Sequence, residues 1–344
     1  MTNNSFAIIC DSTCGLPSEL LARLEVVCVP LSVTARDHVW ADGENDAEAT
    51  EAIRKAGHDA LVQRPSSEAI LSAYRDAVAA GFRKIAVVCS SLESTGTWSE
   101  AEQAVAELEN PGVRVRIVDT GVAAVGTAMV VERMSAARAA GLDFDEAVDR
   151  ARELSRDVRF LYIPGAAAPF VQRALRRGRR SRILARASSV RLRLAGERSL
   201  YLLRGGEYTA LARSTDLADL CGRVAHAMSS VAAGEQRIVY AVMEGASEQA
   251  VRAIEKPLDT NEFRSLFLGH AAAPPSIMAS IGVDAVGVAF APMDAYLRAG
   301  ESRPPVSNAA DGDPASGSLA AEAVASEPEA GKGAGEPADA LASE

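Results

Sequence analysis

The chain has 344 residues, of which 48% are hydrophobic and 24% are charged, and this composition fits a globular protein with two domains. The formal net charge is −10, but residues 301–344 alone hold nine acidic and two basic side chains, so the rest of the chain carries only −3. Together with an aromatic content of 5%, this weak net charge argues against a nucleic-acid-binding protein.

The first half of the chain alternates between short apolar segments and helical segments. Strands are predicted over residues 6–10, 26–33, 85–88 and 113–118, with a bend in the second at Pro30. Helices are predicted to begin near Pro17 and to cover residues 46–55, 69–80, 99–108, 122–140 and 144–156. This alternation predicts an α/β domain over residues 1–156, built on a parallel, doubly wound sheet.

The second half is mixed in character. Strands are predicted over residues 159–163, 199–203, 208–212, 237–243, 263–268 and 285–291, and helices over 216–231, 247–256 and 275–281. Gly205-Gly206, between two of these strands, predicts a tight hairpin. We therefore expect a mixed α/β domain over residues 157–300. Residues 301–344 are rich in Ala, Glu, Gly, Pro and Ser, so we predict a disordered tail.

Hydroxyl-bearing turns follow three strands of the predicted parallel sheet. They are Asp11-Ser12-Thr13, the stretch Cys89 to Trp98, and Asp119-Thr120. Because ligands bind beyond the carboxyl ends of parallel strands, we expect these turns to converge on one crevice. Hydroxyls and the free N–H groups of a helix start both favour an anion. The alternative interpretation is that each hydroxyl only caps a helix.

Several kinds of site and location are not supported by the sequence. No G-x-G-x-x-G or Walker loop follows a strand, so we expect no nucleotide cofactor. The four histidines lack metal-ligand spacing, so we expect no metal site. Five dispersed cysteines favour reduced thiols, and the N-terminal residues hold no apolar stretch typical of a secretion signal. No apolar run is long enough to span a membrane. We therefore expect a cytoplasmic protein.

Five short motifs, in order, resemble those of the DegV family. Ile9 to Pro17 resembles the opening D-S-T-x-x-L-P, and Arg64 to Glu68 resembles S-[QR]-P-S-P. Thr95 to Ala101 resembles S-G-T-Y-x-S-A. Val118-Asp119-Thr120 resembles the V-D-S turn, and Leu175 to Arg180 resembles L-x-x-G-G-R. The resemblance covers the chain from about Phe6 to Pro292.

The resemblance implies a two-domain α/β protein that buries one long-chain fatty acid. In this family the carboxylate is held by hydroxyls and a histidine and is presented to the catalytic subunit of a fatty acid kinase. The implied function is therefore that of a carrier, with catalysis on the partner. The predicted ligand-binding residues are Thr95, Gly96, Ser12, Ser91, Val62 and Ser280. Ser91 lies outside the family motifs and is included, like Ser90 and Arg64, as a residue that could compensate for altered motif positions.

The sequence departs from the family pattern at several of these positions. Val62 stands where the family places a threonine, and Ser280 stands where it places a histidine. Asp284 replaces a glycine of the late H-x-G-P-G element. Losing one hydrogen-bond donor to a buried charge costs about 1–3 kcal/mol. An alternative is therefore a divergent member that binds another small ligand or only a partner protein.

Residues 172–193 hold nine arginines and no acidic residue. Arg173, Arg176, Arg177 and Arg180 are spaced to form one cationic helix face, which is usually just solvated. The functional interpretation is a docking surface for the kinase partner; nucleic-acid binding is the rival that the charge balance disfavours.

An enzyme that uses the hydroxyl turn for acyl or phosphoryl transfer is a further alternative. It is disfavoured because the chain has no G-x-S-x-G elbow and no evident histidine partner for a serine.

Overall fold

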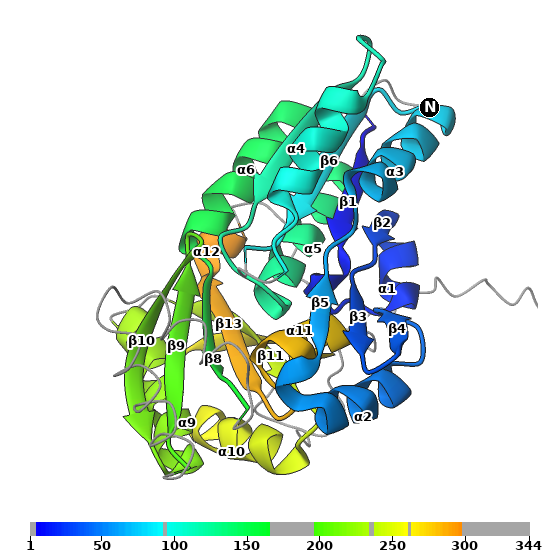
Figure 1. Ribbon diagram of the computed structural model, residues 1–344. Helices are drawn as coiled ribbons and strands as arrows, with labels where there is room; N and C mark the ends of the chain where they lie inside the picture. Colours follow the sequence, from blue (N-terminus) through cyan, green and yellow to red (C-terminus); the bar gives the residue numbers. More distant parts are fainter. Residues whose placement is uncertain (1–4, 92–94, 166–195, 234–236, 261–262, 298–344) are drawn as a thin grey trace, which may run out of the picture.

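The computed structural model describes residues 5–91, 95–165, 196–233, 237–260 and 263–297. Its strands form three sheets, and the chain runs from the first two into the third (Figure 1). The sequence prediction of an α/β fold with one parallel and one mixed sheet is confirmed. No helix in the described ranges is both long and apolar enough to cross a membrane.

The parallel sheet lies in the N-terminal half and has the strand order β2-β1-β6-β7. Its strands are β1 (Ala7–Asp11), β2 (Val26–Val29), β6 (Lys84–Cys89) and β7 (Arg114–Asp119). One face packs against α3 (Ser67–Ala79) and α4 (Trp98–Glu107). The other face packs against α1 (Ser18–Arg23), α5 (Val125–Ala139) and α6 (Phe144–Asp157). Helices on both faces explain why the strands are apolar on both sides.

A small antiparallel sheet of order β4-β3-β5 follows β2. It consists of β3 (Ser32–Ala35), β4 (His38–Ala41) and β5 (Leu61–Gln63), and it packs against α2 (Asp46–Ala56). The strand predicted over residues 26–33, with a bend at Pro30, is divided at that proline into β2 and β3, which belong to different sheets. The chain leaves the parallel sheet at Pro30, which has no N–H for the ladder, and enters the small sheet at Ser32.

The mixed sheet has the order β10-β9-β8-β13-β11-β12, and only β11 and β12 pair in parallel. Its strands are β8 (Arg159–Ile163), β9 (Arg198–Arg204), β10 (Glu207–Ser214), β11 (Ile238–Glu244), β12 (Ser265–Ala272) and β13 (Val286–Pro292). Gly205 and Gly206 form the predicted hairpin turn with φ of 58° and 77°. Helices α9 (Leu217–Val231) and α10 (Glu248–Asp259) cover one face.

Helix α5 fills the space between the parallel and the mixed sheets (Figure 1). Ten of its 15 residues are buried, on all sides of the helix. It therefore lacks the polar face of a surface helix. Two short helices, α11 (Pro275–Ile281) and α12 (Met293–Tyr296), flank the last strand. The short 3-10 helices η1 (Ser12–Cys14) and η2 (Gly57–Asp59) complete the described elements.

Some sequence predictions lie outside the described residues. These are the tail over residues 301–344 and the cationic face of Arg173, Arg176, Arg177 and Arg180. All strands of the parallel and small sheets precede residue 120, and all strands of the mixed sheet follow residue 158. The domain boundaries at residues 156 and 300 remain predictions.

Candidate functional site

The three hydroxyl turns meet at the carboxyl edge of the parallel sheet, as the sequence predicts. The backbone N–H of Ser90, after β6, donates to Asp11 Oδ2 at 3.0 Å. The hydroxyl of Ser91 donates to Asp119 at the end of β7. Adjacent strands β1, β6 and β7 therefore bring their polar ends into one hydrogen-bonded group.

Asp11 is the centre of this group. Its side chain, in a residue that is only 3% exposed, accepts bonds from Thr97 Oγ1 at 2.7 Å and from the hydroxyl and N–H of Thr13. Burial raises the pKa of Asp11 to about 6, while the bonds from Thr13, Ser90 and Thr97 oppose the rise. The carboxylate therefore holds the β1 turn and the start of α4 in place, and it sits where a bound anion would feel its charge.

A second buried carboxylate, Asp42, joins this turn to the mixed-sheet half of the molecule. Asp42 follows β4, and its carboxylate accepts a hydrogen bond from the hydroxyl of Ser12 at 2.7 Å. It also accepts hydrogen bonds from the N–H and the hydroxyl of Ser276, on α11, at 2.9 and 2.5 Å. Burial raises the pKa of Asp42, and the bonds from Ser12 and Ser276 oppose that shift. The hydroxyl of the predicted ligand residue Ser12 thus donates its hydrogen bond to Asp42, and its oxygen accepts a hydrogen bond from the N–H of Leu31 at 2.9 Å.

Thr95 and Gly96 lie beside Ser90, ahead of α4. Thr95 is fully buried, and its hydroxyl oxygen lies 3.5 Å from that of Ser90, which is at the limit of hydrogen bonding. The carbonyl of Gly96 accepts Arg64 Nη1 at 3.0 Å. Arg64 also lies 3.6 Å from Glu100, with 43% of its side chain exposed. Two buried hydroxyls in weak contact, with a cation nearby, are the part of the site best suited to receive an anion.

The other predicted ligand residues lie at the edges of this region. Ser280, buried on α11, donates to the carbonyl of Ser276 at 2.8 Å. Val62 pairs with Val33 in the small sheet and packs against its apolar core. Ser91 is held by Asp119, which also accepts the N–H of Gly121 at 3.0 Å.

The family profile described as "Uncharacterised protein, DegV family" matches residues 5–293. The chain belongs to the DegV family. A DegV domain-containing protein of Deinococcus radiodurans is 27% identical over 297 residues, which is 85% of this chain and 100% of the relative. A DegV domain-containing protein of Streptomyces coelicolor is 30% identical over 149 residues, and that match spans 43% of this chain and 52% of the relative.

Solved structures, two of them of DegV proteins, share the fold of this chain. A DegV family protein of Thermus thermophilus, described by its fatty acid binding, has a TM-score of 0.70 at 23% identity. The match covers 84% of this chain and 100% of the T. thermophilus chain. DegV of Bacillus subtilis, described as a fatty acid binding protein, has a TM-score of 0.67 at 17% identity, with coverage of 84% and 99%. A stearic acid-binding protein of Eubacterium ventriosum has a TM-score of 0.67 at 19% identity, with coverage of 85% and 99%.

One departure of this DegV protein from the family motifs is partly offset by its surroundings. Asp284 lies after α11, where its charge would repel a carboxylate. The structure pairs it with Arg54 Nη1 of α2 at 3.1 Å, and about a third of its side chain is exposed. Arg54 also pairs with Glu51 at 3.3 Å, so it compensates only part of the charge of Asp284.

A small cavity of about 10 Å³ reaches Asp11 and Thr97. Its other walls are mostly apolar and come from β1, β2, β6 and α3: Ile9, Cys10, Val29, Pro65, Ile70, Val87 and Cys89. Such a cavity holds about one water molecule. An acyl chain bound at this DegV site therefore needs volume beyond this cavity.

Sequence reasoning missed three residues of the site: Asp42, Thr97 and Ser276. Asp42 precedes Gly43 and looks like an ordinary turn residue, and its partner Ser276 is 234 positions away. Thr97 is part of the hydroxyl turn, so the signal was present, but nothing in the pattern distinguishes it from the neighbouring hydroxyls.

Proposed function

We propose that this DegV-family protein is a non-catalytic carrier that binds one long-chain fatty acid. The observation that most supports this proposal is the pair of buried hydroxyls of Ser90 and Thr95 at the carboxyl edge of the parallel sheet. A fatty acid carboxylate accepts hydrogen bonds from such donors more strongly than a neutral group does. The fatty acid binding ascribed to the related structures from T. thermophilus and B. subtilis supports this choice of ligand.

The charges around the hydroxyls determine how the site treats an anion. Arg64 lies at the carbonyl of Gly96, next to Thr95, and favours a carboxylate there, while its ion pair with Glu100 at 3.6 Å offsets part of its charge. Asp11 opposes it whenever Asp11 is ionised. Because burial raises the pKa of Asp11 to about 6, we expect binding to strengthen as the pH falls toward that value, provided that the ligand itself stays ionised.

The apolar chain supplies most of the affinity, at about 0.8 kcal/mol for each buried methylene. The carboxylate head then lies at the buried hydroxyls next to the partly exposed Ser91, and we propose that a second protein approaches it from that side. We infer that this partner is the catalytic subunit of a fatty acid kinase, which forms an acyl phosphate. Arg173, Arg176, Arg177 and Arg180 are the proposed docking residues, and the cytoplasm is the proposed compartment.

A second candidate is a DegV protein that takes a different small ligand or only a protein partner. One observation favours it: Ser12, a motif hydroxyl, is already bonded to Asp42 and Leu31. Under this alternative the buried carboxylates are structural and the hydroxyls of the turn hold no fatty acid.

Native mass spectrometry of protein purified from a bacterial host separates the two candidates. A fatty acid at near one-to-one stoichiometry, identified after solvent extraction, supports the carrier. A ligand-free protein that also ignores added oleate and palmitate supports the alternative.

The head-group assignment is tested by Thr95→Val, which keeps the shape of the side chain and removes one buried hydroxyl. A hydrogen bond to a charged group contributes about 1.5–3 kcal/mol, so we expect fatty acid binding to weaken by about tenfold to a hundredfold. The matched control is Thr209→Val on β10, where the residue is exposed and belongs to the other sheet. Equal affinity of the Thr95→Val variant and the unaltered protein places the carboxylate elsewhere.

A further inference from the structure

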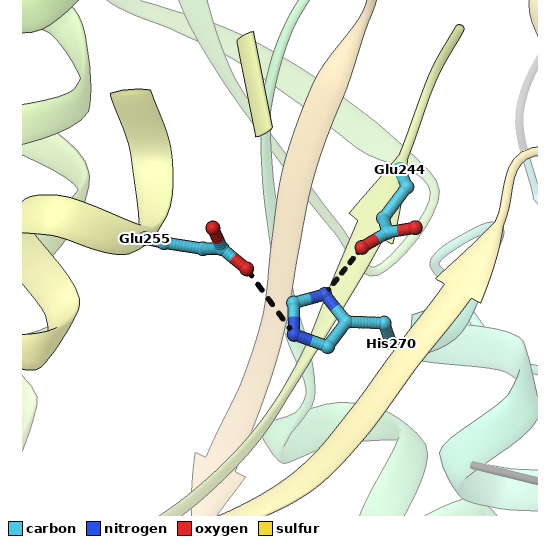
Figure 2. Close-up of side chains that lie close together, drawn as sticks. All are labelled: Glu244, Glu255 and His270. Atoms are coloured by element: carbon cyan, nitrogen blue, oxygen red, sulfur yellow. Dashed lines mark ion pairs between the residues drawn. The ribbon is translucent and has the colours of Figure 1, made fainter. Parts of the chain in front are cut away.

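His270 lies between two carboxylates at the edge of the mixed sheet (Figure 2). It belongs to the edge strand β12, Glu244 ends the neighbouring strand β11, and Glu255 comes from α10. Glu244 Oε1 lies 2.7 Å from His270 Nδ1, and Glu255 Oε1 lies 3.4 Å from Nε2. One potential ligand atom from each residue falls within 4.8 Å of the other two.

An irregularity in β12 directs His270 toward this group. The register against β11 shifts between the pairs Tyr240–Phe267 and Val242–His270, so that β12 contains one extra residue. Gly269, at the shift, has a φ of 117°, which favours glycine. As a result His270 meets the ring of Phe267 edge-on at 5.0 Å, and its side chain is only 14% exposed.

The group combines two carboxylates with one imidazole, and the carboxylate of Asp259 lies one helical turn beyond Glu255 on α10. Arg252, on the same helix, pairs with Glu248 at 3.1 Å and also offsets part of the charge of Glu255. Two carboxylates and an imidazole, partly buried together, therefore favour a bound cation.

The geometry around Nδ1 of His270 is unusual for a simple ion pair. Glu244 Oε1 is close, at 2.7 Å, but it lies off the direction of an N–H bond, so that this buried nitrogen has no hydrogen-bond partner. Nδ1 is therefore available to a metal ion, since no hydrogen bond among the described residues uses it. A shared cation would hold this nitrogen and the Glu244 oxygen together, because ligands of one metal ion lie close together without hydrogen bonds between them.

We propose that Glu244, Glu255 and His270 form a binding site for one divalent transition-metal ion, with Zn²⁺ as the best fit. Imidazole and carboxylate ligands suit Zn²⁺, and three protein ligands with a water in the fourth position are a common zinc arrangement. Mg²⁺ and Ca²⁺ prefer oxygen ligands alone. A zinc ion binds one imidazole nitrogen at about 2.0–2.1 Å. Glu244 lies at Nδ1 and Glu255 at Nε2, so one of the two glutamates must change its rotamer to reach an ion on the nitrogen that the other contacts.

The ion adds a link between α10 and the strands β11 and β12, which already pair with each other in the sheet. Strand β12 continues after a short connection into α11, which carries Ser276. Because the ion binds the folded protein and not the separated ligands, it raises the midpoint of thermal unfolding. Sequence spacing gives no sign of this site, since its three ligands come from separate elements.

Zinc binding to the full-length chain tests the proposal directly. The protein is treated with a chelator, dialysed, and titrated with ZnCl₂ by calorimetry and by thermal unfolding. We expect one ion per chain, a higher unfolding midpoint, and at least a tenfold loss of affinity in His270→Asn and in Glu255→Gln. The matched control is His58→Asn, whose imidazole pairs with Asp59 at 3.4 Å on the surface, with 60% of its side chain exposed. This variant should bind zinc as the unaltered protein does.

The thiols of Cys10 and Cys14, whose sulfurs lie 3.9 Å apart, are a rival site for a soft metal. Substitution of Co²⁺ for Zn²⁺ distinguishes them, because only thiolate ligands give strong sulfur-to-cobalt charge-transfer absorption. Absence of binding, such a charge-transfer band, or equal affinity in the His270→Asn and Glu255→Gln variants overturns the proposal. Thermal unfolding of each variant without metal shows whether that variant is folded. If His270→Asn is not folded, the zinc affinity of Glu255→Gln, which preserves the size of the side chain, tests the proposal alone.

Discussion

The buried carboxylate of Asp11 should make the stability of the protein depend on pH. Burial raises its pKa from 3.8 to about 6, because the hydrogen bonds it accepts replace only part of the lost hydration. The folded protein therefore keeps a proton that the unfolded chain releases between these two pH values. At about 1.36 kcal/mol per pKa unit, the ionised carboxylate lowers the free energy of unfolding by about 3 kcal/mol. This destabilisation is absent below pH 3.8, grows as the pH rises, and is complete above about pH 6.

The substitution Asp11→Asn isolates this contribution. The amide has a similar shape but does not titrate, so its own effect on stability is the same at every pH. We expect the free energy of unfolding of Asp11→Asn, relative to the unaltered protein, to rise by about 3 kcal/mol from below pH 3.8 to above pH 6. Urea denaturation of ligand-stripped protein at a series of pH values measures this difference, and other titrating groups cancel in it.

Asp76→Asn, at an exposed position of α3, is the control for a change of one carboxylate without burial. It should leave the pH dependence of unfolding almost unchanged. If Asp11→Asn shows the same pH dependence as the unaltered protein, the reasoning from burial is refuted, and Asp11 titrates like a solvated carboxylate.

Two further substitutions test the contacts that join the halves of the molecule. Ser276→Ala removes the hydrogen bond from a hydroxyl to the buried carboxylate of Asp42, so we expect the free energy of unfolding in urea to fall by about 1.5–3 kcal/mol. The control is Ser155→Ala, which removes a buried hydrogen bond to a neutral helix carbonyl and should lower the free energy of unfolding by less. Gly121→Ala places a Cβ 2.7 Å from the Cα of Gly205 at a φ of 66°, so we expect a loss of at least about 1 kcal/mol, seen as a lower midpoint of thermal unfolding; a midpoint equal to that of the unaltered protein contradicts this close approach.

The sequence was a good guide where a local pattern dictates the structure. The run from Ile85 to Val88 is apolar and β-branched, and it forms the centre of the buried strand β6. Gly205-Gly206 readily adopts the positive φ angles that a tight hairpin turn needs, and the structure has this hairpin between β9 and β10. The convergence of polar turns at Asp11, Ser90 and Asp119 follows from the parallel arrangement of their strands.

The sequence was a poor guide where the structure depends on contacts between distant segments. Strand β5 is only three residues long, and it exists because it pairs with β3. The bond between Asp42 and Ser276 depends on how α11 packs against the small sheet, which no local pattern encodes. The contact between Glu255 and His270 likewise arises from the packing of α10 on the edge of the mixed sheet.

The position of α5 has a consequence for how the protein folds. A helix with ten buried residues, inserted between two sheets, contributes its packing energy to both of them at once. Cutting the chain after α6 would uncover the side of α5 that faces the mixed sheet, leaving a fragment with a large exposed apolar surface. We therefore expect the two halves to melt in a single cooperative transition and the N-terminal half to aggregate when produced alone. The two sheets are separate in topology, but their stabilities are shared.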